Sequence, residues 1–251
     1  MKSLMVNAAK AAGKAILKNY HNIGKLKFKA PRNLVTKSDV LSEKAVIGTI
    51  RKKFPEHNFL TEESGVINKG SEYTWIVDPI DGTTNFVAKI PQFAVSIALA
   101  KNNEVLMGVV YNPCSNEMFF AEKGKGSYLN NKKLKVSKKN NFEHCILGFN
   151  LPNDINIGKK TLSILHKNCG VFRVFRNSGS AALNLCYVAD RRFDLYFSLG
   201  IKAWDIAAAK LIVEEAGGKT TNINNKKWDI NDTTIAGSNK ILHDKFIKLL
   251  R

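Results

Sequence analysis

A few acidic side chains stand where they could bind metal ions, in a chain that is otherwise basic. Glu62 and Glu63 follow one short apolar run, and Asp78 and Asp81 close another. Asp205 stands at the expected start of a helix. Because the chain has 39 Lys and Arg against 21 Asp and Glu, a net charge of +18, acidic residues that gather in one place need an explanation. Carboxylate oxygens are hard ligands that suit Mg²⁺, so these residues indicate a metal site.

The segment around Asp78 and Asp81 could bring both carboxylates to one point. The apolar residues 75–77 predict a buried strand with Asp78 at its carboxyl end. Pro79 fixes φ and lacks an N–H, so we expect the chain to turn there. In that turn the two carboxylates and the carbonyl of Ile80 could face a common ion. The simpler alternative is that the two aspartates only shape a turn, as Asp and Pro often do.

Gly82 and Thr83 follow directly and could hold a phosphate group, because backbone N–H groups at a helix start bind anions. Metal ligands next to phosphate donors indicate metal-assisted hydrolysis of a phosphoryl group. Other motifs do not fit the sequence. The acids lack the spacing of an EF-hand loop, and no G-x-S-x-G marks a serine hydrolase. Val213 stands where a P-loop ending at Thr220 needs its first glycine.

Several segments along the chain carry a combined signature. Residues 75–86 read W-I-V-D-P-I-D-G-T-T-N-F, residues 62–64 read E-E-S, and residues 34–39 read L-V-T-K-S-D. Residues 204–208 read W-D-I-A-A, and residues 215–218 read E-A-G-G. Their order and spacing, from about residue 34 to 218, resemble those of the inositol monophosphatase family. The T-T-N-F ending is more similar to the inositol monophosphatase branch than to the related nucleotidases.

This resemblance implies a metal-binding role for each matching acid. Glu62, Asp78 and the carbonyl of Ile80 would bind a first Mg²⁺. Asp78 would bridge to a second Mg²⁺, which Asp81 and Asp205 would also hold. Glu62 would further help to place a third ion and the attacking water, so that two or three Mg²⁺ serve the site.

The resemblance also implies catalytic and substrate contacts. Thr83, oriented by Asp39, would help Glu62 to activate the water. Gly82 and Thr83 would hold the phosphate, and backbone groups at a helix start would line the substrate side. The expected substrate-binding residues are Asp81, Gly82, Thr83, Gly179, Ser180, Ala181 and Asp205. Asp39 could instead simply cap a helix, and Asp205 on its own would be interpreted as a helix cap.

The substrate implied by the resemblance is a small phosphate monoester, first of all inositol 1-phosphate. Ser198 stands where this branch commonly has a glutamate that contacts sugar hydroxyls, so selectivity for inositol stays open. Lys202 nearby could favour a substrate with additional negative charge. Fructose 1,6-bisphosphate, histidinol phosphate and a 3′-phosphonucleotide are the alternatives. The resemblance also implies a homodimer.

The net charge of +18 keeps a different class of function open. A basic protein can bind nucleic acid, so a role in binding RNA or the transcription machinery is the second candidate. The lysines are spread along the whole chain, which favours compositional drift over a dedicated surface. No apolar run approaches the about 20 residues of a membrane span. Lys10, Lys14 and Lys18 interrupt the alanine-rich start, so we expect a cytoplasmic protein without a membrane partner.

The elements that must position these residues can be predicted from periodicity. Helices are expected at residues 2–20 and from Ser38 or Asp39 to residue 54, where Pro55 stops the second helix. Strands are expected at residues 58–61, 74–78, 93–101, 104–112 and 117–122, with a hairpin at 101–104. Beyond about residue 140, helices near 159–168, from 178, at 205–216 and at 239–250 alternate with strands at 171–175 and 193–198.

This pattern predicts an α/β (α+β) chain. Residues 1–140 would place helices on an antiparallel sheet and carry most of the metal ligands. Residues 141–251 would form an alternating α/β half that completes the site, so that both halves make a single compact catalytic unit. The resemblance implies the layered αβαβα sandwich of the sugar-phosphatase type. The four cysteines lack C-x-x-C spacing and are expected to be reduced.

Overall fold

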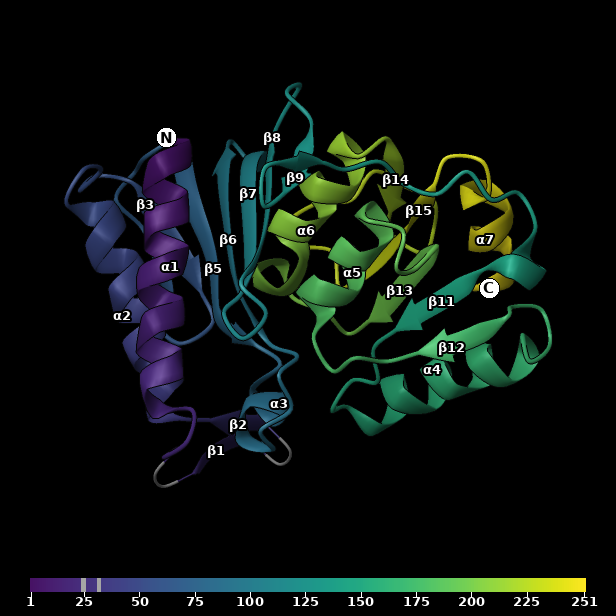
Figure 1. The fold of residues 1–251 in the computed structure, drawn as a ribbon, viewed down its shortest axis with the longest axis horizontal. Helices are drawn as coiled ribbons and strands as arrows, with labels where there is room; N and C mark the ends of the chain where they lie inside the picture. The colour runs from purple at the N-terminus through teal and green to yellow at the C-terminus, as the bar shows by residue number, and fades with distance from the viewer. Residues whose placement is uncertain (24–25, 31–32) are drawn as a thin grey trace.

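The computed structural model describes residues 1–23, 26–30 and 33–251, and its elements stack in layers (Figure 1). A helix pair, an eight-stranded sheet, a second helix pair, a five-stranded sheet and an outer helix pair follow one another. The predicted α/β fold with an αβαβα sandwich is therefore confirmed. Among these residues no helix combines the length and the apolar character that crossing a membrane requires.

The first helix pair, at the left of Figure 1, covers the outer face of the eight-stranded sheet. It consists of α1 (Lys2–Asn19) and α2 (Lys37–Arg51). α1 buries Ala8, Ala12 and Ile16 against α2 and the sheet, because these positions repeat with the period of a helix. The expected amphipathic helix at the start of the chain is confirmed.

The predicted ends of α2 were wrong by a few residues. Thr36, not Ser38 or Asp39, is the N-cap, and its hydroxyl accepts the N–H of Ser38 at 3.1 Å. The carboxylate of Asp39 completes a capping box by accepting the N–H of Thr36 at 2.7 Å. The helix ends at Arg51 rather than at residue 54, and residues 52–53 form a turn before Pro55.

The eight-stranded sheet is built from residues 58–133 in the order β10-β9-β8-β7-β6-β5-β3-β4. Its strands are β3 (Asn58–Thr61), β4 (Gly65–Ile67), β5 (Tyr73–Asp81), β6 (Ala94–Lys101), β7 (Glu104–Asn112), β8 (Glu117–Glu122), β9 (Ser127–Leu129) and β10 (Lys132–Lys133). All neighbours are antiparallel except β3 and β5, which are parallel. The predicted hairpin is confirmed: Lys101 pairs with Glu104, and Asn102 and Asn103 adopt the positive φ that such a turn needs.

The segment before the expected phosphate donors differs from the prediction. β5 does not end at Asp78 but continues to Asp81, with Pro79 inside an irregularity of its pairing with β6. Pro79 needs no ladder hydrogen bond at a bulge, which is why the strand tolerates it. The short helix α3 (Thr83–Val87) begins immediately afterwards. It contacts β2 (Asn33–Val35), which pairs with β1 (Lys27–Ala30) in a separate two-stranded sheet that the sequence pattern does not predict.

The two central helices are α5 (Ala181–Ala189) and α6 (Ala203–Glu215), which lie between the sheets (Figure 1). Every residue of α5 is buried, and α6 is buried along most of its length. A helix that is apolar on all sides needs cover on all sides, and the two sheets provide it. Ser180 caps α5, which therefore begins three residues later than expected.

The five-stranded sheet has the order β12-β11-β13-β15-β14. Its strands are β11 (Ile146–Phe149), β12 (Val174–Arg176), β13 (Leu195–Leu199), β14 (Gly218–Thr221) and β15 (Thr234–Asn239). The outer helices α4 (Ile155–Lys167) and α7 (His243–Leu249) pack on it, and a 3₁₀ turn spans Phe142–His144.

The predictions for this second half were less accurate. β11, β14 and β15 are not predicted, because β11 has only four residues and the other two strands combine a glycine with several polar residues. The last helix begins at His243 rather than at residue 239, because β15 extends to Asn239 and a turn at residues 240–242 follows it. All four cysteines are free, as expected.

Candidate active site

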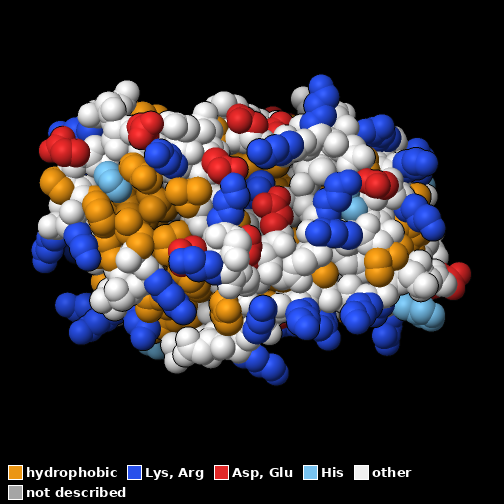
Figure 2. Space-filling view, turned by 90° about the horizontal axis from the view of Figure 1, so that it is seen from above, with side chains coloured by type: hydrophobic (Ala, Val, Ile, Leu, Met, Phe, Trp, Pro, Cys, Tyr) orange, Lys and Arg blue, Asp and Glu red, His pale blue; other side chains and the backbone are white. Residues whose placement is uncertain are grey.

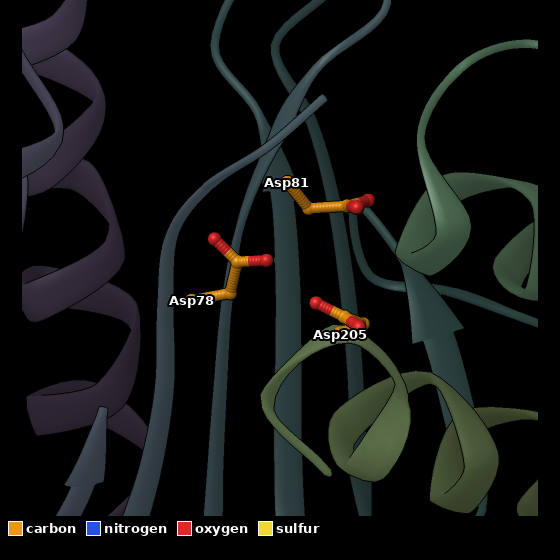
Figure 3. Close-up of side chains that lie close together, drawn as sticks. All are labelled: Asp78, Asp81 and Asp205. Atoms are coloured by element: carbon orange, nitrogen blue, oxygen red, sulfur yellow. The ribbon is translucent and has the colours of Figure 1, made fainter. Parts of the chain in front are cut away.

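Three aspartates from two elements meet at one point. Asp78 and Asp81 lie at the end of β5, and Asp205 lies in the first turn of α6. One carboxylate oxygen of each lies within 4.8 Å of those of the other two. Figure 3 shows the three side chains directed toward a common space between the strands and the helix. Asp78 is 2% exposed and Asp81 is 7% exposed, while Asp205 is half-buried, so two of the three carboxylates are withdrawn from the surface.

A bulge in β5 explains why Asp78 and Asp81 face the same side. In a regular strand, residues three apart point to opposite faces of the sheet. Asp78 pairs with Ser96, and Asp81 pairs with Ala94 two positions earlier, so β5 carries one extra residue. That extra residue restores the same facing for both carboxylates. The N–H of Ile80 donates to Asp78 Oδ1 at 2.9 Å inside the bulge.

The cluster is electrostatically unfavourable without a cation. Burial and then the charge of Glu62 raise the pKa of Asp78 well above its usual range. Burial also raises the pKa of Asp81 to about 6 and that of Asp205 to about 8. Within the described part of the chain, no lysine or arginine forms an ion pair with the three aspartates. Three converging carboxylates without a basic partner fit a hard divalent cation such as Mg²⁺.

Glu62 belongs to the same site from a third direction. It follows β3, and its N–H donates to the carbonyl of Val77 at 3.2 Å, which sets it beside Asp78. Its side chain lines the cavity that Asp81 and Asp205 also line. The parallel pairing of β3 with β5 brings the carboxyl ends of both strands to one edge of the sheet.

The start of α5 holds Asp81. Its carboxylate accepts the N–H of Ala182 at 2.8 Å, the N–H of Ala181 at 3.1 Å and the hydroxyl of Ser180. These donors favour the charged form of Asp81, which partly offsets the effect of burial on its pKa. The backbone group of Ala181, expected to face the substrate, thus donates to an expected metal ligand.

Asp205 is held by its own helix. Its Oδ2 accepts the N–H of Lys202 at 2.8 Å, which is one half of a capping box. The carbonyl of Trp204 accepts the hydroxyl of Ser96 on β6 at 3.1 Å, so the first turn of α6 is fixed to the sheet beside β5. Asp205 therefore caps α6 and also belongs to the carboxylate cluster.

Asp39 and Thr83 are joined as the resemblance implies. The hydroxyl of Thr83 lies 3.3 Å from Asp39 Oδ1 and 3.0 Å from the carbonyl of Ile80, and can donate to either. Asp39 Oδ2 accepts the N–H of Thr36 at 2.7 Å and the Thr36 hydroxyl at 2.6 Å. Asp39 thus caps α2 with one oxygen and reaches Thr83 with the other. Burial raises the pKa of Asp39 as well.

Gly82 and Gly179 approach each other closely at the rim. Gly82 has φ +94°, and a Cβ there would lie 3.1 Å from the carbonyl oxygens of Gln92 and Gly179. Asn85 ties this region together by donating to the carbonyls of Gln92 and Ser178, both at 2.6 Å. The motif T-T-N-F contains Asn85, but the sequence does not show which distant segment it binds.

Two adjoining cavities open over these residues. One of about 420 Å³ is lined by Glu62, Asp81, Ala181 and Asp205, together with Ser198 and Lys202. One of about 360 Å³ is lined by Gly82, Thr83 and Gly179. Both share the lining residues Asn150, Leu151 and Asn153, which precede α4. Sequence reasoning missed these residues, because nothing in a polar loop marks it as part of a distant site.

The sequence and the fold both match known proteins. The model of the inositol monophosphatase family matches residues 1–251. The chain is 41% identical over 228 residues to Nus factor SuhB of Pasteurella multocida, which covers 89% of this chain and 85% of that protein. It is 35% identical over 254 residues to inositol-1-monophosphatase of Caulobacter vibrioides, which covers 98% and 99%. The solved structure of an IMPase from Thermotoga maritima is similar with a TM-score of 0.91 at 32% identity, covering 100% of this chain and 97% of that one.

Proposed function

This chain belongs to the inositol monophosphatase family, and on that premise we propose that it hydrolyses a small phosphate monoester with the help of Mg²⁺. Inositol 1-phosphate is the first candidate substrate. The observation that carries the proposal is the meeting of the buried Asp78 and Asp81 with the half-buried Asp205, without a basic partner among the described residues. A structural role would leave this repulsion without compensation.

The proposed reaction transfers the phosphoryl group to water. The water oxygen forms a new bond to phosphorus, the ester P–O bond breaks, and the leaving alkoxide takes up a proton. Bound Mg²⁺, held by Glu62, Asp78, Asp81, Asp205 and the carbonyl of Ile80, would neutralise the phosphate and make the attacking water more acidic.

The chain's own residues would orient the water and the phosphate. When Thr83 donates to Asp39, its hydroxyl oxygen is left to accept a hydrogen bond from the attacking water, and it would take that proton as it passes its own proton to the Asp39 carboxylate. The backbone N–H groups of Gly82 and Thr83 lie at the start of α3 and would bind the phosphate oxygens.

The leaving group would occupy the cavity beside Ser198 and Lys202. Ser198 is a short neutral side chain that can donate or accept one hydrogen bond. Lys202 brings a positive charge to the same rim. This lining leaves fructose 1,6-bisphosphate, histidinol phosphate and a 3′-phosphonucleotide as alternative substrates.

Phosphate release from a panel of these four substrates tests the proposal. The assay compares Mg²⁺ with EDTA, and the unaltered chain with Asp78→Asn. Turnover that requires Mg²⁺ and disappears in the variant is the expected result, and the fastest substrate identifies the leaving group. A folded chain that releases no phosphate from any of the four would count against the proposal.

A second candidate function is binding to nucleic acid or to the transcription machinery. Its support is the net charge of +18 and the similarity to relatives named Nus factor SuhB. On the face shown in Figure 2, however, lysine and arginine side chains are spread over the whole face and do not gather in one patch. Filter binding to RNA at several salt concentrations tests this candidate, since purely non-specific attraction gives a steep salt dependence without sequence preference.

A further inference from the structure

One buried face of α2 contacts three separate segments of the candidate site. Asp39 accepts from Thr83, and the hydroxyl of Ser42 donates to the carbonyl of Pro79, inside the β5 bulge, at 2.9 Å. Glu43 contacts the turn that follows β3. All three α2 side chains are at most 2% exposed. The buried polar side chains of α2 therefore hydrogen-bond to segments of the site, in addition to the apolar packing of the helix.

Glu43 binds the turn that carries Glu62. Its Oε2 accepts the N–H of Glu63 at 2.9 Å, and its Oε1 accepts the hydroxyl of Ser64. Glu43 is 2% exposed, and no lysine or arginine among the described residues forms an ion pair with it. A buried carboxylate without a counterion is unfavourable unless hydrogen-bond donors compensate. The two donors of this turn supply that compensation.

The turn needs support because it lies at the edge of the sheet. β3 and β4 are the last two strands in the order, and β4 has only three residues, none of which is fully buried. Inside the hairpin, the N–H of Ser64 donates to the Thr61 hydroxyl at 3.2 Å. The contact with Glu43 adds a fixed point from a different element, on the two residues directly after Glu62.

We propose that Glu43 is a positioning residue of the metal site, whose carboxylate fixes the 62–64 turn so that Glu62 faces the cavity beside Asp78. The inference rests on the proposed function, since it assumes that Glu62 is a metal ligand. Groups that hydrogen-bond to the metal-binding shell typically change metal affinity about 10–100-fold when they are removed. Glu43 binds the two residues that follow Glu62, so it acts on the expected metal ligand through the backbone of their turn.

Two substitutions at Glu43 separate positioning from simple packing. Glu43→Met keeps the length of the side chain and removes both acceptors. Glu43→Gln can accept from Glu63 with its Oε1 and donate to the Ser64 oxygen with its Nε2, so both contacts persist as neutral hydrogen bonds. The probe is Mn²⁺, titrated calorimetrically into the metal-free full chain without substrate.

We expect Glu43→Met to weaken Mn²⁺ binding about tenfold or more. We expect Glu43→Gln to stay within about fivefold of the unaltered chain, because neutral hydrogen bonds retain roughly half the strength of charge-assisted ones. In hydrolysis assays the Mg²⁺ concentration for half-maximal rate should rise in parallel, while the KM for substrate at saturating Mg²⁺ changes little. Unaltered Mn²⁺ affinity in a folded Glu43→Met chain would overturn the inference.

Glu215→Met is the matched control. Like Glu43, Glu215 belongs to a helix and its carboxylate binds a loop, where it accepts the N–H groups of Gly124 and Gly126 at 2.8 and 2.7 Å. It does not line the two cavities of the site. This variant should lose stability and keep its Mn²⁺ affinity. An equal loss of affinity in Glu215→Met would show that Glu43 acts only through general stability.

If Glu43→Met does not fold, Ser64→Ala replaces it, since it removes one of the two contacts in a partly exposed turn. Mn²⁺ affinity equal to that of the unaltered chain would then overturn the inference. The metal titration also separates this inference from the proposed function. A chain that binds Mn²⁺ through the Glu43-dependent turn but hydrolyses no phosphate ester would contradict only the proposed function. A chain that binds no Mn²⁺ would overturn both.

Discussion

Asp81 Oδ2 accepts the backbone N–H of Ala182 at 2.8 Å, so an expected metal ligand on β5 also fixes the start of α5. The two residues are 101 positions apart in the chain. Asp78, by contrast, accepts a hydrogen bond from Ile80 within its own bulge. Two aspartates of one motif therefore contribute differently to stability.

Asp81→Ala should destabilise the metal-free protein, whereas Asp78→Asn should not. The first change leaves the N–H groups of Ala181 and Ala182 and the Ser180 hydroxyl without their acceptor, which costs about 1–3 kcal/mol. The second keeps an acceptor for Ile80 and removes one charge from a repelling group. Urea unfolding in EDTA measures both free energies of unfolding. A larger loss in Asp78→Asn than in Asp81→Ala would contradict this division of roles.

The stability of the metal-free protein should depend on pH through Asp205. Burial and then the charge of Asp81 raise the pKa of Asp205 from 3.8 to about 8. The folded protein thus holds this proton more tightly than the unfolded chain, and the resulting stabilisation is lost as pH rises from 3.8 to about 8. Asp205→Asn removes this one titration, while Asp78 and Asp81 still titrate in both chains. In EDTA, the Tm of Asp205→Asn relative to the unaltered chain should therefore increase with pH and level off above about 8.

Mg²⁺ should show the complementary trend in the unaltered chain. Below the pKa of Asp205 the ion must displace a proton, so the Tm increase caused by Mg²⁺ should grow between about pH 6 and 8. Asp205→Asn should show a smaller and flatter increase. A Tm difference between the two chains that is constant with pH would rule out Asp205 as the titrating group.

The sequence predicts the acidic part of this site well, because the information is local. The dense run of residues 75–86 places expected metal ligands and expected phosphate donors within one segment, and the antiparallel hairpin at 101–104 follows from Asn102 and Asn103. The backbone conformation of this segment is harder to predict from the sequence. Asp and Pro are compatible with a turn or with a bulge at Pro79, and only the pairing of β5 with β6 decides between them.

Contacts between distant segments are what the sequence does not show. Glu43 has the spacing of an ordinary helix residue, and its contact with Glu63 depends on how α2 lies against the sheet. Asn85 stands in a conspicuous motif, yet its acceptor at Ser178 lies 93 residues away. Such side chains become functional only through tertiary packing, which no local pattern encodes.

Gly179→Ala should impair the site by steric conflict with Asn85. Gly179 has φ +81°, and a Cβ there would lie 2.6 Å from Asn85 Nδ2. The side chain of Asn85 would have to release the carbonyls of Gln92 and Ser178. We expect a loss of activity of about tenfold or more, because a misplacement of about 1 Å in an active site can cost about 100-fold in rate.

Gly217→Ala is the control for backbone strain alone. Gly217 has φ +88°, but a Cβ added at this residue would meet no atom within 4 Å, so only the left-handed conformation opposes the change. That strain costs about 1–2 kcal/mol of stability and should leave activity intact. Equal activity in the Gly179→Ala and Gly217→Ala chains would show that the Asn85 contact does not matter for the site.

Ser198→Glu should change which phosphate ester the protein prefers. Ser198 is 2% exposed and lines the cavity beside Asp205, so a longer carboxylate there reaches toward the leaving group. A carboxylate accepts hydrogen bonds from polyol hydroxyls and repels a second phosphate group. The kcat/KM for inositol 1-phosphate should therefore rise relative to that for fructose 1,6-bisphosphate. Each 1.4 kcal/mol of discrimination between the two substrates changes this ratio about tenfold. Ser198→Gln separates charge from length, because it has the same reach without the repulsion. Relative rates that stay the same in Ser198→Glu across the substrate panel would remove residue 198 from the determinants of specificity.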